Sequence, residues 1–374
     1  MTWKIPLFKI YWDESDVEYV KREIESGMNW AVGPNVIKFE KMIRERVGTD
    51  YAVVFNSGTS ALHSLLIAYG INKGDEVIVP SFTFISTANS PLFVGAKPVF
   101  ADIEMETLGL DPDSVRENIT DKTKAILPIH YGGCPCKIEE LKDLADDYDL
   151  VLIEDAAESL GAKIKDKNVG TFGDSAVLSF CQNKIITTGE GGAVVTDSRE
   201  IYEKLLLIRS HGRLESSDYF SSLEPFDYVT LGYNFRMSNI TATLGISQLE
   251  KLDKIIEMRR SNSRYLTENL NDQIDKIIPL KSPNDYYHVY QLYNVLADDR
   301  DELMKYLADK GIMTKIYFDP VHQTYFYKKK LRYNVDLPVT TEIANKILTL
   351  PMYPGLQKDE IDFIIREIKN FYRR

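Results

Sequence analysis

The feature that most constrains the fold is an alternation of short apolar segments with amphipathic segments between about residue 50 and residue 200. Each apolar segment carries almost no charge, so it is suited to burial on both faces. Strands of this kind, separated by helices, are typical of a mostly parallel sheet covered by helices on both sides. The segments that we interpret as strands are 51–55, 76–80, 98–102, 125–130, 150–153, 176–180 and 193–196.

The helical patterns and a change in composition predict two domains of an α/β protein. After about residue 262 the chain gains Tyr and Lys, and 286–296 is interpreted as an edge strand of a small sheet. We expect a large domain with the parallel sheet over 1–255 and a smaller C-terminal α/β domain over 256–374. The segment 214–229 has no clear period and is interpreted as an extended loop. The predicted helices are 59–69, 86–94, 139–147, 200–210, 241–258, 301–310 and 359–371.

Composition excludes several classes of partner. The formal net charge of −11 argues against nucleic acid, which requires a basic patch or stripe, and against an anionic membrane surface. There is no apolar run of roughly 18 residues to predict a transmembrane helix, and the start lacks the basic and apolar regions of a signal peptide. The three cysteines do not make a disulfide framework, so we expect a cytoplasmic protein. Cys134 and Cys136 form C-x-C without a second ligand cluster, which indicates a structural turn and no metal site.

Lys184 lies in a polar, glycine-rich stretch between two predicted strands, 176–180 and 193–196. The stretch 181–192 reads Cys-Gln-Asn-Lys-Ile-Ile-Thr-Thr-Gly-Glu-Gly-Gly. A lysine between strands is most often an ordinary loop charge. In such polar surroundings, however, a lysine is also suited to a covalent bond with an aldehyde cofactor.

A second segment, 55–61, has the sequence Phe-Asn-Ser-Gly-Thr-Ser-Ala and joins a predicted strand to a predicted helix. A helix N-terminus offers N–H groups and a positive dipole end to a phosphate, and Thr59 and Ser60 add hydroxyl donors. The same residues are what an ordinary helix N-cap prefers.

Asp155 follows the predicted strand 150–153, where its carboxylate would face the ligand crevice at the end of a parallel sheet. A cofactor with a pyridine nitrogen needs an anion there, because the protonated ring is the better electron sink. An aspartate that caps the next helix is an equally good interpretation of this segment alone.

Two further segments add candidates. The cluster 232–239 could address phosphate or carboxylate through Asn234 and Arg236, or could simply cap the following helix. The segment 80–84 could offer the ring of Phe84 for stacking on a flat cofactor, although aromatic residues at such positions more often belong to the core.

The order of these segments resembles the DegT/DnrJ/EryC1/StrS sugar aminotransferases, which belong to the fold type I aspartate aminotransferase superfamily. The resemblance covers nearly the whole chain, and the Lys184 motif is its most specific part. It implies pyridoxal 5′-phosphate, with pyridoxamine 5′-phosphate as its intermediate form, in a cytoplasmic homodimer with shared active sites. The other segments that carry it are 30–34, 320–322 and 350–354.

The resemblance also implies roles for individual residues. Lys184 would bind the cofactor covalently and then shuttle the proton, and Asp155 would pair with the pyridine nitrogen. Glu158 would lie near the cofactor's 3-oxygen, and Phe84 would stack on the ring. The implied phosphate ligands are Gly58, Thr59 and Ser179, with Asn234 of the partner subunit; the implied substrate residues are Trp30, Arg236 and His322.

The implied reaction moves the amino group of L-glutamate to a keto sugar on a nucleotide diphosphate. The segment 155–161, Asp-Ala-Ala-Glu-Ser-Leu-Gly, is more similar to members that aminate C4 of 4-keto-6-deoxy sugars, such as the GDP-perosamine synthases. Members that act at C3 more often carry Gln or His at the position of Glu158, so C3 amination is the alternative. A dehydratase of the same family would have histidine in place of Lys184, and a non-enzymatic regulatory protein would be expected to lose the lysine, the aspartate or the phosphate site.

Overall fold

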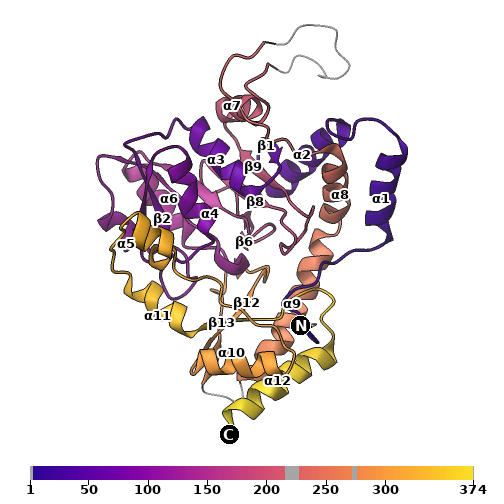
Figure 1. The fold of residues 1–374 in the computed structure, drawn as a ribbon, viewed down its shortest axis with the longest axis vertical. Helices are drawn as coiled ribbons and strands as arrows, with labels where there is room; N and C mark the ends of the chain where they lie inside the picture. The colour runs from indigo at the N-terminus through magenta and orange to yellow at the C-terminus, as the bar shows by residue number, and fades with distance from the viewer. Residues whose placement is uncertain (1–2, 215–226, 272–275, 374) are drawn as a thin grey trace.

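A computed structural model describes residues 3–214, 227–271 and 276–373, and it shows a larger lobe and a smaller lobe (Figure 1). The larger lobe is built on a seven-stranded sheet with the order β1-β9-β8-β5-β4-β2-β3. β9 is antiparallel to both of its neighbours, and the other pairs are parallel. The predicted α/β class with a mostly parallel sheet is therefore confirmed. The strands are β1 (Tyr51–Phe55), β2 (Glu76–Pro80), β3 (Lys97–Ala101), β4 (Thr123–Ile126), β5 (Val151–Asp155), β8 (Ser175–Ser179) and β9 (Gly192–Thr196).

β4 ends earlier than its sequence predicts. The apolar run continues to His130, but the strand stops at Ile126. Pro128 lies in the remainder and has no N–H to extend a ladder of hydrogen bonds. A separate three-stranded sheet is formed by short strands of two residues each: β6 (Lys163–Ile164), β7 (Lys167–Asn168) and β11 (Tyr286–Tyr287).

Helices cover both faces of the central sheet. Successive residues of each strand point to opposite faces, so one strand contributes side chains to two different core clusters. Val53 packs with a cluster that contains residues of α3, and Val54 packs with a cluster that contains residues of α2 and α8. The helices of this lobe are α1 (Glu14–Glu25), α2 (Pro34–Val47), α3 (Gly58–Ala68), α4 (Ile85–Phe93), α5 (Pro112–Glu117), α6 (Ile138–Asp147), α7 (Arg199–Arg209) and α8 (Asn239–Leu249).

The single helix predicted over 241–258 is wrong. The chain forms α8 and then α9 (Leu252–Asn271), separated by a turn. Lys251 lies in this turn, and its Nζ forms ion pairs of 3.0 Å with Asp13 and 2.7 Å with Asp16. These contacts attach the start of α1 beside α8, as Figure 1 shows.

The smaller lobe has a three-stranded antiparallel sheet in which β12 is the central strand, not an edge strand. The predicted strand 286–296 is also divided, because 286–287 pairs with β6 of the larger lobe. The predicted boundary between residues 255 and 256 falls within α9 and stays a prediction, and most of the predicted loop 214–229 lies outside the described residues. The elements are β10 (Ile277–Pro279), β12 (Tyr293–Ala297), β13 (Ile347–Leu350), α10 (Arg300–Asp309), α11 (Pro338–Lys346) and α12 (Lys358–Tyr372).

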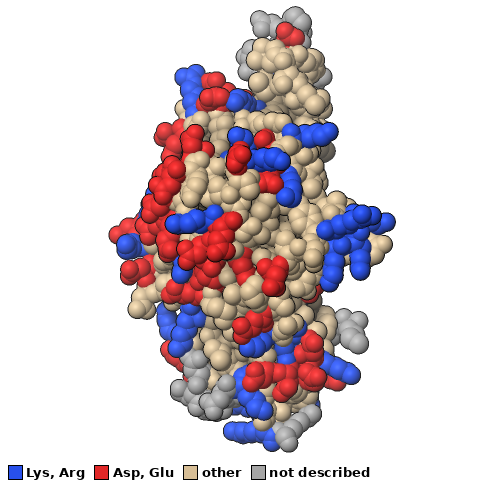
Figure 2. All heavy atoms as spheres, turned by 90° about the vertical axis from the view of Figure 1, so that its left-hand side faces the viewer, with Lys and Arg blue, Asp and Glu red and all other residues tan. Residues whose placement is uncertain are grey.

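The surface carries charges of both signs, with acidic side chains spread widely over the face shown in Figure 2 and a projecting group of basic ones at its edge. Among the described residues, none of the helices is both long enough and apolar enough to span a bilayer.

Candidate active site

A cavity of about 390 Å³ opens at the carboxyl ends of the parallel strands, which is where ligands of such sheets bind. Residues of both lobes line it. Seven of the residues proposed from the sequence meet there: Gly58, Thr59, Phe84, Asp155, Glu158, Ser179 and Lys184.

Lys184 is held on a turn whose ends belong to the β8–β9 ladder. The backbone N–H of Lys184 donates to the carbonyl of Cys181 at 2.9 Å. Thr187 closes the turn twice, because its hydroxyl donates to the carbonyl of Phe180 at 3.0 Å and accepts from the N–H of Gly189 at 2.9 Å. Gly189 has a φ of +82°, a conformation that favours glycine. The Thr-Thr-Gly motif therefore fixes the turn that presents the lysine.

The amine of Lys184 faces a buried carboxylate. Its Nζ lies 3.2 Å from Oε1 of Glu158, whose side chain is only 3% exposed. The other oxygen, Oε2, accepts the backbone N–H of Gly132 at 2.9 Å. Glu158 is thus oriented by the turn at 131–133 while it contacts the lysine.

Asp155 ends β5 with its carboxylate buried in the cavity wall. The hydroxyl of Thr87 donates to Oδ2 at 2.8 Å, and the N–H of Ala157 donates to Oδ1 at 3.1 Å. Burial raises the pKa of Asp155 above its ordinary value, and these two hydrogen bonds offset only part of that effect. Among the described residues, no cation forms an ion pair with this carboxylate.

The neighbouring carboxylate, Glu154, points to the opposite face of β5 and is fully buried. Its four donors are the Nε2–H of His130 at 2.9 Å and the N–H groups of Gly170, Phe172 and Gly173, each at 2.8 Å. His130 can donate from Nε2 because its Nδ1 accepts the N–H of Cys136 at 3.0 Å. Burial alone would raise the pKa of Glu154, but the hydrogen bonds lower it below its ordinary value.

The N-terminus of α3 approaches the sheet closely. Ser57 caps the helix, since its hydroxyl accepts the N–H of Ser60 at 3.1 Å. The N–H groups at the start of a helix have no acceptor within the helix and can face an anion. A Cβ on Gly192 would lie 2.5 Å from the backbone nitrogen of Gly58, so this approach requires glycine. The hydroxyl of Thr59 lies 2.8 Å from that of Ser86 at the same edge of the cavity.

Four residues proposed from the sequence lie outside the lining of this cavity. Asn234 is exposed, Trp30 is half exposed, and Arg236 donates to the hydroxyl of Ser210 at 3.2 Å. His322 is buried, with its Nδ1 2.6 Å from the hydroxyl of Ser81. Their roles stay predictions.

The cavity also contains residues that the sequence did not single out. Ser86 and Thr87 were recognisable in principle, because they begin a predicted helix that follows a strand end, and Asn183 lies within the Lys184 motif. Lys315, Tyr317 and Phe318 gave no motif, since they reach the cavity from the smaller lobe.

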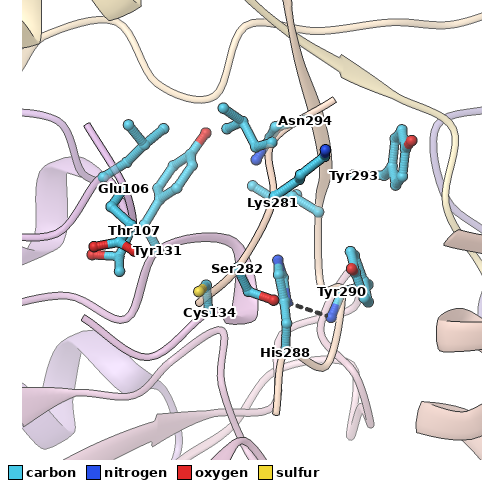
Figure 3. A pocket seen from close by; sticks show the side chains of 13 residues that line it. Glu106, Thr107, Tyr131, Cys134, Lys281, Ser282, His288, Tyr290, Tyr293 and Asn294 are labelled. Carbon is cyan, nitrogen blue, oxygen red and sulfur yellow. Dashed lines mark hydrogen bonds between the residues drawn. The ribbon is translucent and has the colours of Figure 1, made fainter. Parts of the chain in front are cut away.

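A second hollow lies between the lobes and is far smaller, with a volume of about 20 Å³ (Figure 3). Cys134, His288 and Tyr290 lie at it, and the N–H of Tyr290 donates to Nδ1 of His288 at 2.8 Å. Burial, and then the charge of Arg260, lower the pKa of His288 to about 3, so this imidazole is neutral. The hollow has room for about one water molecule and is too small for a sugar.

The chain is similar to known proteins over its whole length. The profile of the DegT/DnrJ/EryC1/StrS aminotransferase family matches residues 11–369. A GDP-perosamine synthase of Escherichia coli O157:H7 is 36% identical over 371 residues, which cover 98% of each chain. PseC of Helicobacter pylori, an aminotransferase involved in the biosynthesis of pseudoaminic acid, superposes with a TM-score of 0.92 at 28% identity, over 99% of each chain. The PMP form of the putative sugar aminotransferase Spr1654 of Streptococcus pneumoniae superposes with a TM-score of 0.91 at 25% identity, over 100% of this chain and 99% of that one.

Proposed function

Because this chain belongs to the DegT/DnrJ/EryC1/StrS aminotransferase family, we propose that it transfers the amino group of L-glutamate to a keto sugar carried on a nucleoside diphosphate. It is a sugar aminotransferase that depends on pyridoxal phosphate. We place the new amine at C4 of a 4-keto-6-deoxyhexose. The relation to a GDP-perosamine synthase and the presence of Glu158 support this position.

The observation that carries the proposal is the fit of the cavity to pyridoxal 5′-phosphate. Asp155 is a buried carboxylate without an ion-pair partner among the described residues, as a protonated pyridine nitrogen requires. Gly58 and Thr59 at the start of α3 offer N–H and hydroxyl donors to a phosphate, with Ser179 beside them. Phe84 is 55% exposed at the cavity and can stack on a flat ring.

We assign a separate role in the reaction to each of three residues, Lys184, Glu158 and Asp155. The bound cofactor supplies the electron sink. Lys184 would hold the cofactor covalently and, once its amine is free, would serve as the acid–base group beside the substrate carbon. Glu158 orients that amine from 3.2 Å. Asp155 is the buried carboxylate that would pair with a protonated ring nitrogen.

Lys184→Ala tests the assignment of the nucleophile. We expect turnover to fall at least a thousandfold, because both the covalent bond and the proton shuttle are lost. The folded state should persist, since the turn is closed by Thr187 and Gly189. Activity close to that of the wild type would show that another residue carries the reaction. Lys204→Ala is the matched control, because Lys204 lies on α7 outside the cavity and its side chain is 45% exposed.

The visible absorbance of the protein with its cofactor tests the donor. L-glutamate should convert the absorbance of the lysine-bound aldehyde form into that of the pyridoxamine form. A protein that binds the cofactor but does not respond to glutamate would indicate another donor. The pyridoxamine form is then offered GDP-, UDP- and dTDP-linked keto sugars, and the carbon that bears the new amine is located by NMR. An amine at C3 would replace the proposed C4 position, and loss of a hydroxyl without an amine would indicate the dehydratase.

The same proposal includes a homodimer in which Asn234 enters the site of the partner subunit. Exposed apolar side chains at Met28, Trp30, Tyr228 and Leu231 support such a contact surface. Mixed dimers of Asn234→Ala and Lys184→Ala should recover activity, because one of their two sites would then be intact. No recovery, with subunit exchange confirmed, would mean that each site is complete within one chain.

A further inference from the structure

The cavity has an excess of negative charge over the cations that line it. Its ionisable carboxylates are Asp155, Glu158 and Glu190, and its lysines are Lys184 and Lys315. Lys184 already forms an ion pair with Glu158 at 3.2 Å, and under the proposed function its amine also serves the cofactor. A further negative charge that enters this cavity therefore meets repulsion unless Lys315 compensates it.

Lys315 is positioned from the smaller lobe. Its backbone N–H donates to the carbonyl of Thr349 at 3.2 Å, and its carbonyl accepts the N–H of Thr349 at 2.8 Å. Thr349 lies on β13 and is buried, so the base of Lys315 is fixed by an antiparallel bridge. Its Nζ lies 4.7 Å from the centre of the Tyr317 ring, which also lines the cavity.

Lys315 is not committed to a carboxylate of its own chain. Among residues 3–214, 227–271 and 276–373, no Asp or Glu forms an ion pair with it. The side chain is exposed, so the ammonium can turn toward a ligand without loss of an existing salt bridge. The aromatic ring beneath it limits the positions that it takes.

We propose that Lys315 is a substrate-binding residue that pairs with an anionic oxygen group of the substrate at the mouth of the cavity. The inference rests on the proposed function, in which both substrates are anions: the donor carries carboxylates and the acceptor carries a diphosphate. A lysine is suited to either group, because it acts as a point charge with rotatable donors.

The test compares Lys315→Met with Lys4→Met and Lys315→Arg. Methionine removes the charge and keeps the length of the side chain. Lys4→Met is the matched control, since Lys4 also rests on an aromatic ring, with its Nζ 3.9 Å from the centre of Phe363, but lies outside the cavity. One arm titrates L-glutamate by absorbance, and the other measures GDP and UDP binding by calorimetry without turnover.

We expect Lys315→Met to lower the affinity for one or both ligands by about tenfold. Lys315→Arg should keep most of the affinity of the wild type. A loss for glutamate alone assigns the contact to the donor's carboxylate. A loss of affinity for the nucleotides alone assigns the contact to the diphosphate. A loss of affinity for both ligands means that both bind to Lys315 at the same position. A change below about twofold in both arms, with the wild type and Lys4→Met binding normally, overturns the inference and leaves the proposed function intact. A wild type that binds neither ligand rejects the proposed function, and the inference with it.

Discussion

The two carboxylates at the end of β5 are neighbours in sequence and opposites in environment. Glu154 accepts four hydrogen bonds on one face of the sheet, and its pKa is lowered despite full burial. Asp155 accepts two on the other face, and burial raises its pKa. Both are inaccessible to bulk water, so exposure does not distinguish them. The number of donors does.

This difference distinguishes a buried charge that stabilises the fold from a buried charge that is available to a ligand. The donors to Glu154 come from His130 and from the backbone of 170–173, so the charge is satisfied within the chain and holds those loops against the sheet. Asp155 keeps an incompletely compensated charge beside a cavity, which is an arrangement that a cationic ligand group completes. The following experiments break or sharpen the contrast, from the largest expected effect to the smallest.

Asp155→Asn should lower the rate of transamination by roughly a hundredfold to a thousandfold, since loss of a preorganised charge commonly has that effect. The amide keeps the size of the side chain, and Thr87 can accept a hydrogen bond from it because its hydroxyl rotates. Steady-state kinetics with a saturating donor measure the effect. An unchanged rate would mean that Asp155 only caps the turn that follows β5, in which no helix begins.

Glu154→Gln should destabilise the protein by about 3 kcal/mol, because either orientation of the amide directs its NH₂ group at two N–H donors. Urea unfolding measures the loss, and Glu140→Gln on the exposed face of α6 should change the free energy of unfolding by less than about 0.5 kcal/mol. A similar small change for Glu154→Gln would contradict the structural role assigned to it.

In the cofactor-free protein, Asp155→Asn should increase stability at pH 7 although it abolishes most activity. The folded pKa of Asp155 is raised, so its contribution to stability is full below the unfolded pKa of 3.8 and is lost as pH rises through the folded value. Asparagine does not incur this loss. Thermal unfolding of both proteins should also show a larger stabilisation by pyridoxal phosphate in the wild type, because only the carboxylate pairs with the ring nitrogen.

Glu154 should give the opposite pH dependence. Its folded pKa is lowered, so its contribution to stability is full above the unfolded pKa of 4.5 and is lost as pH falls through the folded value. The free energy of unfolding of the wild type should therefore decline more steeply below pH 4.5 than that of Glu154→Gln. Parallel curves from urea titrations at several pH values would show that Glu154 is not the group that titrates.

Thr87→Val should have the smallest effect, a fall in rate of up to about tenfold, because one of two hydrogen bonds to Asp155 is lost. Thr83→Val is the matched control. Thr83 is also buried and lies 2.8 Å from the hydroxyl of Thr87, but it makes no hydrogen bond to Asp155. If both variants behave alike, the effect of Thr87→Val comes from packing and not from the carboxylate.

Asp155 and Lys184 could be predicted to reach the cavity from the sequence, because each follows a strand and so lies at the ligand edge of a parallel sheet. The role of Glu154 could not be predicted, because three of its donors are backbone N–H groups that leave no mark in the side-chain pattern. Lys315 was missed for a related reason: its place in the cavity depends on an antiparallel bridge to Thr349 that no local motif encodes.

The turn between α8 and α9 was missed for the same kind of reason. The apolar pattern continues through it, and the contacts of Lys251 that accompany the turn come from Asp13 and Asp16, far away in the sequence. Periodicity within a segment therefore predicted the elements of the large sheet. Contacts between distant segments decided where helices end and which lysines meet at the cavity.

The pleat of β5 makes the chemistry depend on strand register. Ile153, Glu154 and Asp155 pair with Ser175, Ala176 and Val177 of β8 in sequence, and alternate side chains emerge on opposite faces. A slip by one residue would place a glutamate in the cofactor cavity and an aspartate among the donors of the buried loop. Insertions or deletions near this strand are therefore expected to abolish catalysis and stability together, whereas the surface loops can change in length with little effect on either.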